Sequence, residues 1–212
     1  MKRLLPILAT LALALAPGNS AAQVFGQLGG AEPVAMNARL FGAYFGYSQN
    51  QASLLGQLRL SFHPGVDLGF QGGLSRLKSG NQDHASVDLG IDARTLVARR
   101  GPTMPFDVSL GGAIAERSAE GTNLLSVGPT AAASRPLQIA RSTELTPYLG
   151  IAMLLSRSDA GGSSTTDLSV PVRLGAELKP NPDMRLIAEI QLAVSDALGD
   201  NVRLVVGGNF PF

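Results

Sequence analysis

The side chains that could do chemistry in this 212-residue chain are mainly charged ones, since it contains no cysteine and two histidines. The lack of cysteine excludes thiolate chemistry, disulfides and cysteine-ligated zinc. Asp83, His84 and Ser86 bring an acid, a base and a hydroxyl nucleophile close together in the sequence. His63 lies far from them in a His-Pro-Gly turn, so a histidine-based metal site is not expected, and no cofactor is predicted.

A second group consists of twelve charged residues that fall on the polar side of an alternating pattern. They are Arg59, Asp67, Asp88, Asp92, Arg94, Asp107, Asp167, Arg173, Glu177, Arg185, Glu189 and Arg203. Asp88 and Asp92 would lie about 13 Å apart along one strand, too far for a pair of catalytic carboxylates. Acids and arginines on one face predict either salt bridges that fill an interior or the polar lining of a pore.

The elements that must position these charges are β-strands. From about residue 38, apolar and polar residues alternate with a period of two, and Gly-, Pro-, Asn- and Ser-rich breaks separate the segments. Ten strands are predicted, at residues 38–48, 53–62, 66–75, 85–95, 105–116, 123–134, 146–156, 166–178, 184–195 and 201–212. Residues 23–37 form a poorly patterned lead-in segment, and residues 38–212 read as a single domain.

The two faces of these strands differ almost completely. In the seven clearest segments one face has no charged or hydrogen-bonding side chain, and the opposite face carries the twelve charges. The polar face is rich in glycine, as a narrow lumen requires. An arginine on a lipid face at mid-membrane would cost about 2–4 kcal/mol, so the charges are expected inside. The predicted fold is all-β, a single antiparallel up-and-down transmembrane β-barrel of about ten strands, with eight as the fallback.

The first twenty-two residues are typical of a secretory signal peptide. Lys2 and Arg3 precede an apolar run, and small residues before position 23 predict cleavage after Ala22. The remaining 190 residues carry 15 basic and 16 acidic side chains, a balance that gives no reason to propose nucleic acid. The expected location is the bacterial outer membrane.

The breaks between strands predict the topology. The short breaks at 63–65 and 179–183 suit periplasmic turns, and 76–84 and 157–165 suit external loops. The connections at 96–104 and 135–145 are longer than periplasmic turns usually are. A ten-stranded lumen is intermediate in width, which favours a mostly occluded interior or a narrow channel.

The C-terminus resembles the insertion signal of outer-membrane barrels, a glycine followed by two hydrophobic positions of which the last is a terminal aromatic residue. Gly207, Phe210 and Phe212 match it, while Val205 stands where a polar residue is usual. The chain is thus similar to the small bacterial outer-membrane barrels, porin-like or opacity-like, with no subfamily assigned. The resemblance implies insertion by the barrel-assembly machinery.

Two enzyme families of the outer membrane share part of a motif with this chain. The sequence His84-Ala-Ser86 is similar to the His-x-Ser element of lipid A deacylases, but Val87 replaces the asparagine expected next. Ser86 also falls on the polar face, whereas that family works from the lipid side. Omptin-like proteases need an acidic pair in addition to an Asp–His dyad, and only Asp83-His84 is present. No enzyme activity is therefore expected.

The predicted function is a structural or narrow porin-like role in the outer membrane, with a polar, charge-paired lumen. The alternatives are an enzyme acting on envelope lipid, similar to lipid A deacylases, and a soluble periplasmic barrel that binds an apolar ligand. The expected partners are outer-membrane lipid and lipopolysaccharide, and the barrel is expected to be a monomer. Lipopolysaccharide phosphates could be held by basic residues at the outer strand ends, namely Arg76, Lys78, Arg117 and Arg157.

Overall fold

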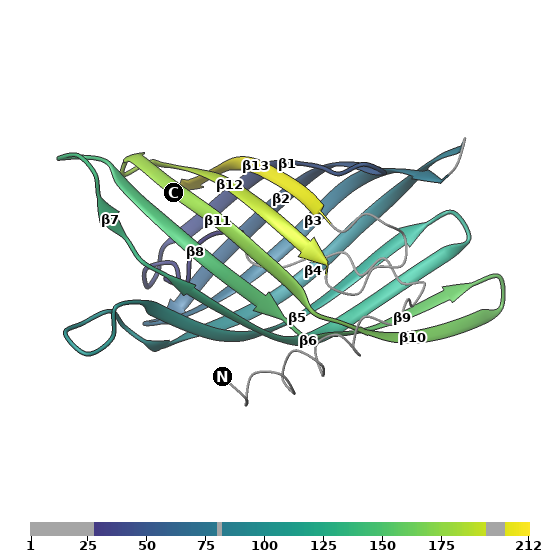
Figure 1. Cartoon of the computed structure of the whole chain (residues 1–212), viewed down its shortest axis with the longest axis horizontal. Helices are drawn as coiled ribbons and strands as arrows, with labels where there is room; N and C mark the ends of the chain where they lie inside the picture. Colours follow the sequence, from purple (N-terminus) through teal and green to yellow (C-terminus); the bar gives the residue numbers. More distant parts are fainter. Residues whose placement is uncertain (1–27, 80–81, 194–201) are drawn as a thin grey trace, which may run out of the picture.

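The alternating segments form long antiparallel strands in the computed structural model, which describes residues 28–79, 82–193 and 202–212 (Figure 1). The expected signal peptide, residues 1–22, lies outside the described residues. The strands are β1 (Arg39–Tyr47), β2 (Gln51–His63), β3 (Val66–Ser79), β4 (Gln82–Ala98), β5 (Asp107–Ala119), β6 (Thr122–Ser134), β7 (Leu137–Gln138), β8 (Glu144–Ala152), β9 (Leu154–Ala160), β10 (Ser163–Ser169), β11 (Pro171–Asn181), β12 (Met184–Ala193) and β13 (Val202–Pro211). None of the described residues forms a helix long and apolar enough to cross a membrane.

The sheet closes on itself as a barrel. Strands β1 to β6 pair in chain order, and β6 pairs with both β8 and β9. The pairs β9–β10, β8–β11, β11–β12 and β12–β13 follow, and β13 pairs with β1. β8 and β9 form one strand broken at Met153, and β10 and β11 form another broken at Val170. With each such pair counted once and the two-residue β7 left out, the closed barrel has ten strands. The predicted antiparallel up-and-down barrel is confirmed, and each of the ten predicted segments corresponds to one strand.

The two breaks lie beside prolines. Pro129 on β6 and Pro171 at the start of β11 have no backbone N–H to give to the ladder. The chain compensates locally, because the Met153 amide donates to the Pro129 carbonyl at 3.0 Å. The barrel wall therefore stays continuous across β6 in spite of the interrupted strands.

The predicted external loops are mostly strand, which corrects the sequence interpretation. Strand β3 extends to Ser79, and the hairpin of β9 and β10 turns through Gly161 and Gly162 alone. The φ angles of these two glycines are 56° and 85°, as a two-residue type I′ turn requires. The strands stay paired in these polar segments because the hydrogen bonds between strands are made by the backbone and need no apolar side chains. We call this end of the barrel the hairpin end.

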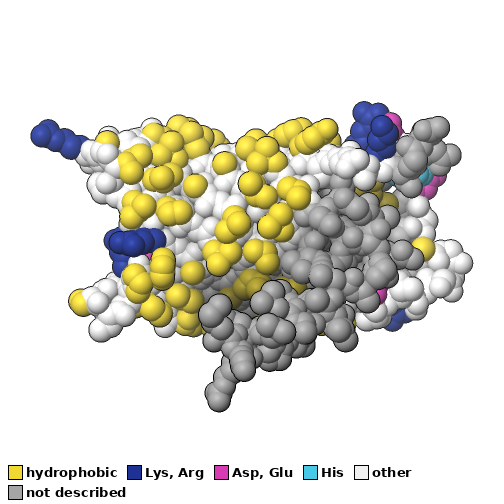
Figure 2. Space-filling model, viewed as in Figure 1, with side chains coloured by type: hydrophobic (Ala, Val, Ile, Leu, Met, Phe, Trp, Pro, Cys, Tyr) yellow, Lys and Arg dark blue, Asp and Glu magenta, His cyan; other side chains and the backbone are white. Residues whose placement is uncertain are grey.

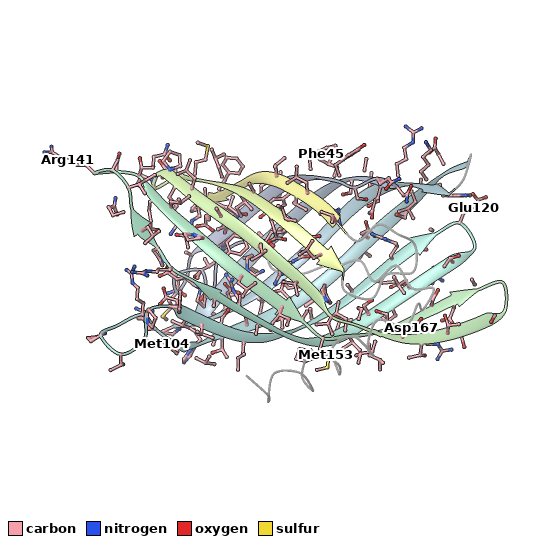
Figure 3. The ribbon with its side chains drawn as sticks, in the orientation of Figure 1. Phe45, Met104, Glu120, Arg141, Met153 and Asp167 are labelled. Carbon is pink, nitrogen blue, oxygen red and sulfur yellow. The ribbon has the colours of Figure 1, made fainter. Side chains whose placement is uncertain are left out.

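The opposite end, which we call the turn end, carries the other connections and the C-terminus. Residues 64–65, 99–106, 135–143 and 182–183 link the strands there. The two longer connections predicted at 96–104 and 135–145 are present at this end, and the second contains β7, which pairs with β8. Figure 3 shows Met104 and Arg141 at the turn end and Glu120 at the opposite one.

On the face seen in Figure 2, hydrophobic side chains cover much of the visible outer surface between the two ends of the barrel. Leu54, Leu89, Ile91 and Ile114 are all more than half exposed on the outer surface. Among the described strand positions that face outward, charges occur near the two ends. At the hairpin end they are Arg76, Lys78, Asp83, Glu116, Arg157 and Asp159, and at the turn end there is Arg39.

Candidate functional site

A segment that precedes the first strand runs inside the barrel. Residues 28–34, which we call the lumen segment, are held to the inner wall by their backbone. The amide of Ala31 donates to Ser134 Oγ at 2.9 Å, and that of Val34 donates to Asp67 Oδ2 at 2.8 Å. The amide of Leu28 donates to Gln57 Oε1 at 3.4 Å. These contacts place the segment between the middle of the lumen and the turn end.

Four of the twelve predicted charges form one cluster on β2, β3 and β4, beside the lumen segment. Arg59 lies 2.6 Å from Asp67 and 2.7 Å from Asp92, and Arg94 lies 2.8 Å from Asp67. All four side chains are almost completely buried. The alternation of inward and outward side chains places all four residues on the inner face. Because Asp67 pairs with Arg94 across the sheet, opposite charges lie next to each other there. We call these four residues the arginine–aspartate cluster.

The cluster also binds the lumen segment. Arg94 donates from Nη1 to the Gly30 carbonyl at 2.7 Å and from Nη2 to the Glu32 carbonyl at 3.1 Å. Asp67 accepts the Val34 amide in addition to both arginines. Hydrogen bonds to ionised groups are stronger than neutral ones, so the cluster fixes the segment's path.

A glycine provides the space for the cluster. At Gly69 on β3, a Cβ would lie 2.6 Å from Arg59 Nη1 and would also collide with the carboxylate of Asp92. A larger residue would push the guanidinium and carboxylate apart. Gly69 therefore leaves the space that charged side chains of the neighbouring strands fill.

An apolar layer lies next to the cluster in the lumen. Leu28 of the lumen segment joins a buried hydrophobic group from five strands, and its members are Leu28, Tyr44, Leu55, Ala115, Ile187 and Val205. Val205 is fully buried and Tyr44 is 1% exposed. An apolar constriction excludes water and ions. The lumen thus contains a polar layer and an apolar layer, and the lumen segment contributes to both.

The opposite wall carries a second polar group. Glu189 accepts from the Tyr148 hydroxyl at 2.8 Å and from Gln191 Nε2 at 2.7 Å. Glu177 lies 3.4 Å from Arg185 and 3.7 Å from Lys179. These side chains come from β8, β11 and β12, whose antiparallel register places them on the inner face.

The remaining predicted charges also face the lumen. Asp88 lies 2.7 Å from Arg117 and accepts from Ser75 Oγ at 2.5 Å, while Asp107 accepts the Arg100 amide at 2.8 Å. Arg203 donates to Ser53. Arg173 is buried with its guanidinium over Gly150, and Asp167 is half-buried on β10 (Figure 3). The structure therefore gathers all twelve residues inside the barrel, in separate groups.

Two tyrosines inside the lumen were not among the predicted site residues. Tyr44 is paired across the sheet with Gly207, and Tyr148 is paired with Gly175. Each ring occupies the space that a side chain on the facing glycine would need. Gly207 was predicted as part of the insertion signal, and in the structure it also makes room for Tyr44. Phe210 and Phe212, the other two residues of that signal, face outward.

The four basic residues predicted at the outer rim divide into two groups. Arg117 is buried in the lumen with Asp88, so its prediction as an external contact is wrong. The reason is that β5 continues to Ala119, and Arg117 lies on its inner face. Arg76, Lys78 and Arg157 are exposed at the hairpin end. The hydrogen bond from Arg76 lowers the pKa of the Asp83 carboxyl.

The candidate catalytic residues are not assembled. His84 Nδ1 lies 3.7 Å from Glu120, and the buried hydroxyl of Ser86 has no hydrogen-bond partner among the described residues. Asp83 forms an ion pair with Arg76 on the outer face. No group of three potential metal ligands is present in the described part of the chain.

The chain shares its fold with a solved outer membrane channel. This channel, from Pseudomonas putida F1, has a TM-score of 0.55 and 13% sequence identity, and the match covers 89% of this chain and 100% of the channel. The KdgM porin matches with a TM-score of 0.42, 9% identity and coverage of 82% and 99%. The N-terminal β-barrel domain of Pseudomonas aeruginosa OprF matches with a TM-score of 0.37, 9% identity and coverage of 84% and 100%. No protein-family model and no curated protein sequence matches the chain. The first likeness supports the barrel fold.

Proposed function

We propose that this chain is an integral outer-membrane channel of narrow, porin-like type, closed by its own lumen segment. The observation that carries the proposal is the backbone of residues 30–34 bound to the arginine–aspartate cluster inside a barrel with an apolar exterior. A purely structural barrel could fill its lumen with wall side chains alone. This one closes it with a separate piece of chain.

The membrane placement follows from the outer surface. Exposed apolar side chains such as Leu54 and Leu89 would be unfavourable in water but match the hydrocarbon of a bilayer. Strands β2 to β6 contain 13 to 17 residues each, which exceeds the roughly 9–11 residues that a tilted strand needs to cross. The excess length extends at the hairpin end, where the outward-facing charges begin.

The same reasoning orients the barrel. Bacterial barrels project their strands beyond the membrane on the extracellular side, so the hairpin end faces outward and the turn end, which carries the C-terminus, faces the periplasm. The chain is exported by its signal peptide and inserted through Gly207, Phe210 and Phe212. Arg76, Lys78 and Arg157 then face the outer leaflet, where lipopolysaccharide phosphates would meet them.

The lumen segment has the properties of a removable closure. It contributes backbone amides and carbonyls to the contacts with the cluster, and its one charged side chain, Glu32, is exposed. If it leaves, Arg59, Asp67, Asp92 and Arg94 keep their ion pairs with one another, so no buried charge is left unpaired. The losses include two hydrogen bonds to Arg94, one each to Asp67, Ser134 and Gln57, and the burial of Leu28.

A reversible cross-link tests this proposal. A Cβ at Gly30 would lie 3.3 Å from the Ser134 Cβ, close to the roughly 3.5–4.5 Å of disulfides, and the chain has no other cysteine. We expect the Gly30→Cys, Ser134→Cys variant, refolded into a planar bilayer, to be silent when oxidised. Addition of a reductant should restore intermittent openings like those of the wild type.

The matched control is Gly30→Cys alone, which should open equally often with and without reductant. Thiol titration after denaturation shows whether the disulfide has formed, and a heat-modifiable gel shift shows that the barrel is folded. An oxidised double variant that conducts as often as the reduced one would exclude the lumen segment as the closure.

A further inference from the structure

A groove lies on the outer surface at the turn end. It has a volume of about 480 Å³ and lies where β1, β2 and the C-terminal residue meet. Leu58, Leu60 and Phe62 of β2 line one side, and Phe212 lines the other. The surface is mainly apolar, and Arg39 at the start of β1 has the one charged side chain among its lining residues. We call it the Arg39 groove.

Arg39 is unusual in its position. Among the described outward-facing strand residues, the other charges lie at the hairpin end, and several of them pair with each other, as Arg76 does with Asp83. No carboxylate of the described chain lies within 4.0 Å of the Arg39 guanidinium. A cation beside apolar side chains at the edge of a membrane surface attracts an anion that has an apolar part.

The backbone holds the groove in place. The Phe212 amide donates to the Arg39 carbonyl at 3.1 Å, which fixes the C-terminal residue next to β1. Arg39 is paired across the sheet with Leu60, so its side chain and that of Leu60 are neighbours on the outer face. The charge and the apolar surface therefore have a fixed relative position, as a binding site requires.

We propose that the Arg39 groove binds a single anionic glycerophospholipid. Arg39 holds the phosphate, because the guanidinium matches phosphate oxygens in a bidentate geometry. An acyl chain lies along Leu58 and Leu60 between the rings of Phe62 and Phe212. The volume falls within the roughly 300–1,000 Å³ of small-molecule sites. This inference rests on the proposed function, which places the turn end in the periplasmic leaflet, where phospholipids reside.

A headgroup with net negative charge should be preferred over a zwitterionic one. A zwitterionic headgroup carries an ammonium that is repelled by Arg39, whereas phosphatidylglycerol brings only the negative phosphate. The preference should weaken with salt, because the groove is open to the membrane–water interface.

The test uses the full-length barrel in mixed micelles that contain phosphatidylglycerol or phosphatidylcholine, with bound lipid counted by native mass spectrometry. We expect one phosphatidylglycerol to be retained per wild-type barrel. Arg39→Gln should lower its affinity about 10-fold or more, because a hydrogen bond to a charged group is lost. Leu60→Trp, which fills the groove and keeps the charge, should reduce retention of both lipids.

Arg141→Gln is the matched control, since Arg141 is an exposed arginine at the same end (Figure 3) but lies in the connection between β7 and β8 and is not among the residues that line the groove. Equal losses in Arg39→Gln and Arg141→Gln would show general electrostatic attraction only and would overturn the proposal, as would full retention in Arg39→Gln. The heat-modifiable gel shift and bilayer insertion of the same samples report on the proposed function separately. A barrel that inserts but shows no lipid preference refutes only the groove.

Discussion

Asp67→Asn is expected to lower the free energy of unfolding of the barrel by about 3–5 kcal/mol, the usual cost of breaking a buried ion pair. Asp67 is 1% exposed and lies within 2.8 Å of both Arg59 and Arg94. Asparagine has nearly the same shape but no charge, so the cavity does not change. Two buried guanidinium groups would then share the single carboxylate of Asp92.

The same substitution should also open the channel. Asp67 accepts the Val34 amide and positions Arg94, which holds the Gly30 carbonyl. We therefore expect longer or more frequent openings in a planar bilayer, together with a lower midpoint in urea followed by the heat-modifiable gel shift. Asp159→Asn, at an exposed ion pair with Arg157, is the control and should change neither quantity. Equal midpoints for the two variants would contradict a stabilising role for the cluster.

Ile91→Arg is expected to cost about 2–4 kcal/mol, because it places a charge on the lipid face near the middle of β4. Ile91 is 54% exposed and pairs across the sheet with Phe70 and Ile114, so its surroundings are apolar on both sides. In a soluble barrel the same change at an exposed position would be nearly neutral. The result thus distinguishes a lipid-facing exterior from a hydrated one.

Thr95→Arg is the control for this effect, since Thr95 lies on the same face of β4, four residues nearer the turn end. It should cost about 0–1 kcal/mol, as charges do near the interface. The measurement is the urea midpoint of each variant refolded in lipid vesicles. Indistinguishable midpoints for Ile91→Arg and Thr95→Arg would support the soluble barrel alternative.

The strand faces were predictable because alternation is a local property of the sequence. Asp88 and Leu89 are adjacent, and a period of two is enough to place one inside and the other outside. Arg117 could also have been placed correctly. The alternation of β5 continues one residue beyond the predicted boundary at 116 and puts Arg117 on the inner face with Asp107.

The lumen segment could not be predicted in the same way. Its contacts use the backbone of Gly30, Ala31, Glu32 and Val34, and backbone groups leave no pattern in the sequence. The ion pairs of the cluster were only partly predictable. The pattern places Arg59, Asp67 and Asp92 on one face, but their distances depend on the register between strands.

The channel conductance of a chain that starts at Met36 tests the central claim most directly. The shortened chain lacks residues 28–35 but keeps β1 and the hydrogen bond from the Asn37 amide to the Ser61 carbonyl. With folding verified by the heat-modifiable gel shift, the account predicts steady conductance from the shortened barrel and a mostly closed state for the full-length one. Equal conductance of the two folded barrels would show that the lumen segment does not close the channel.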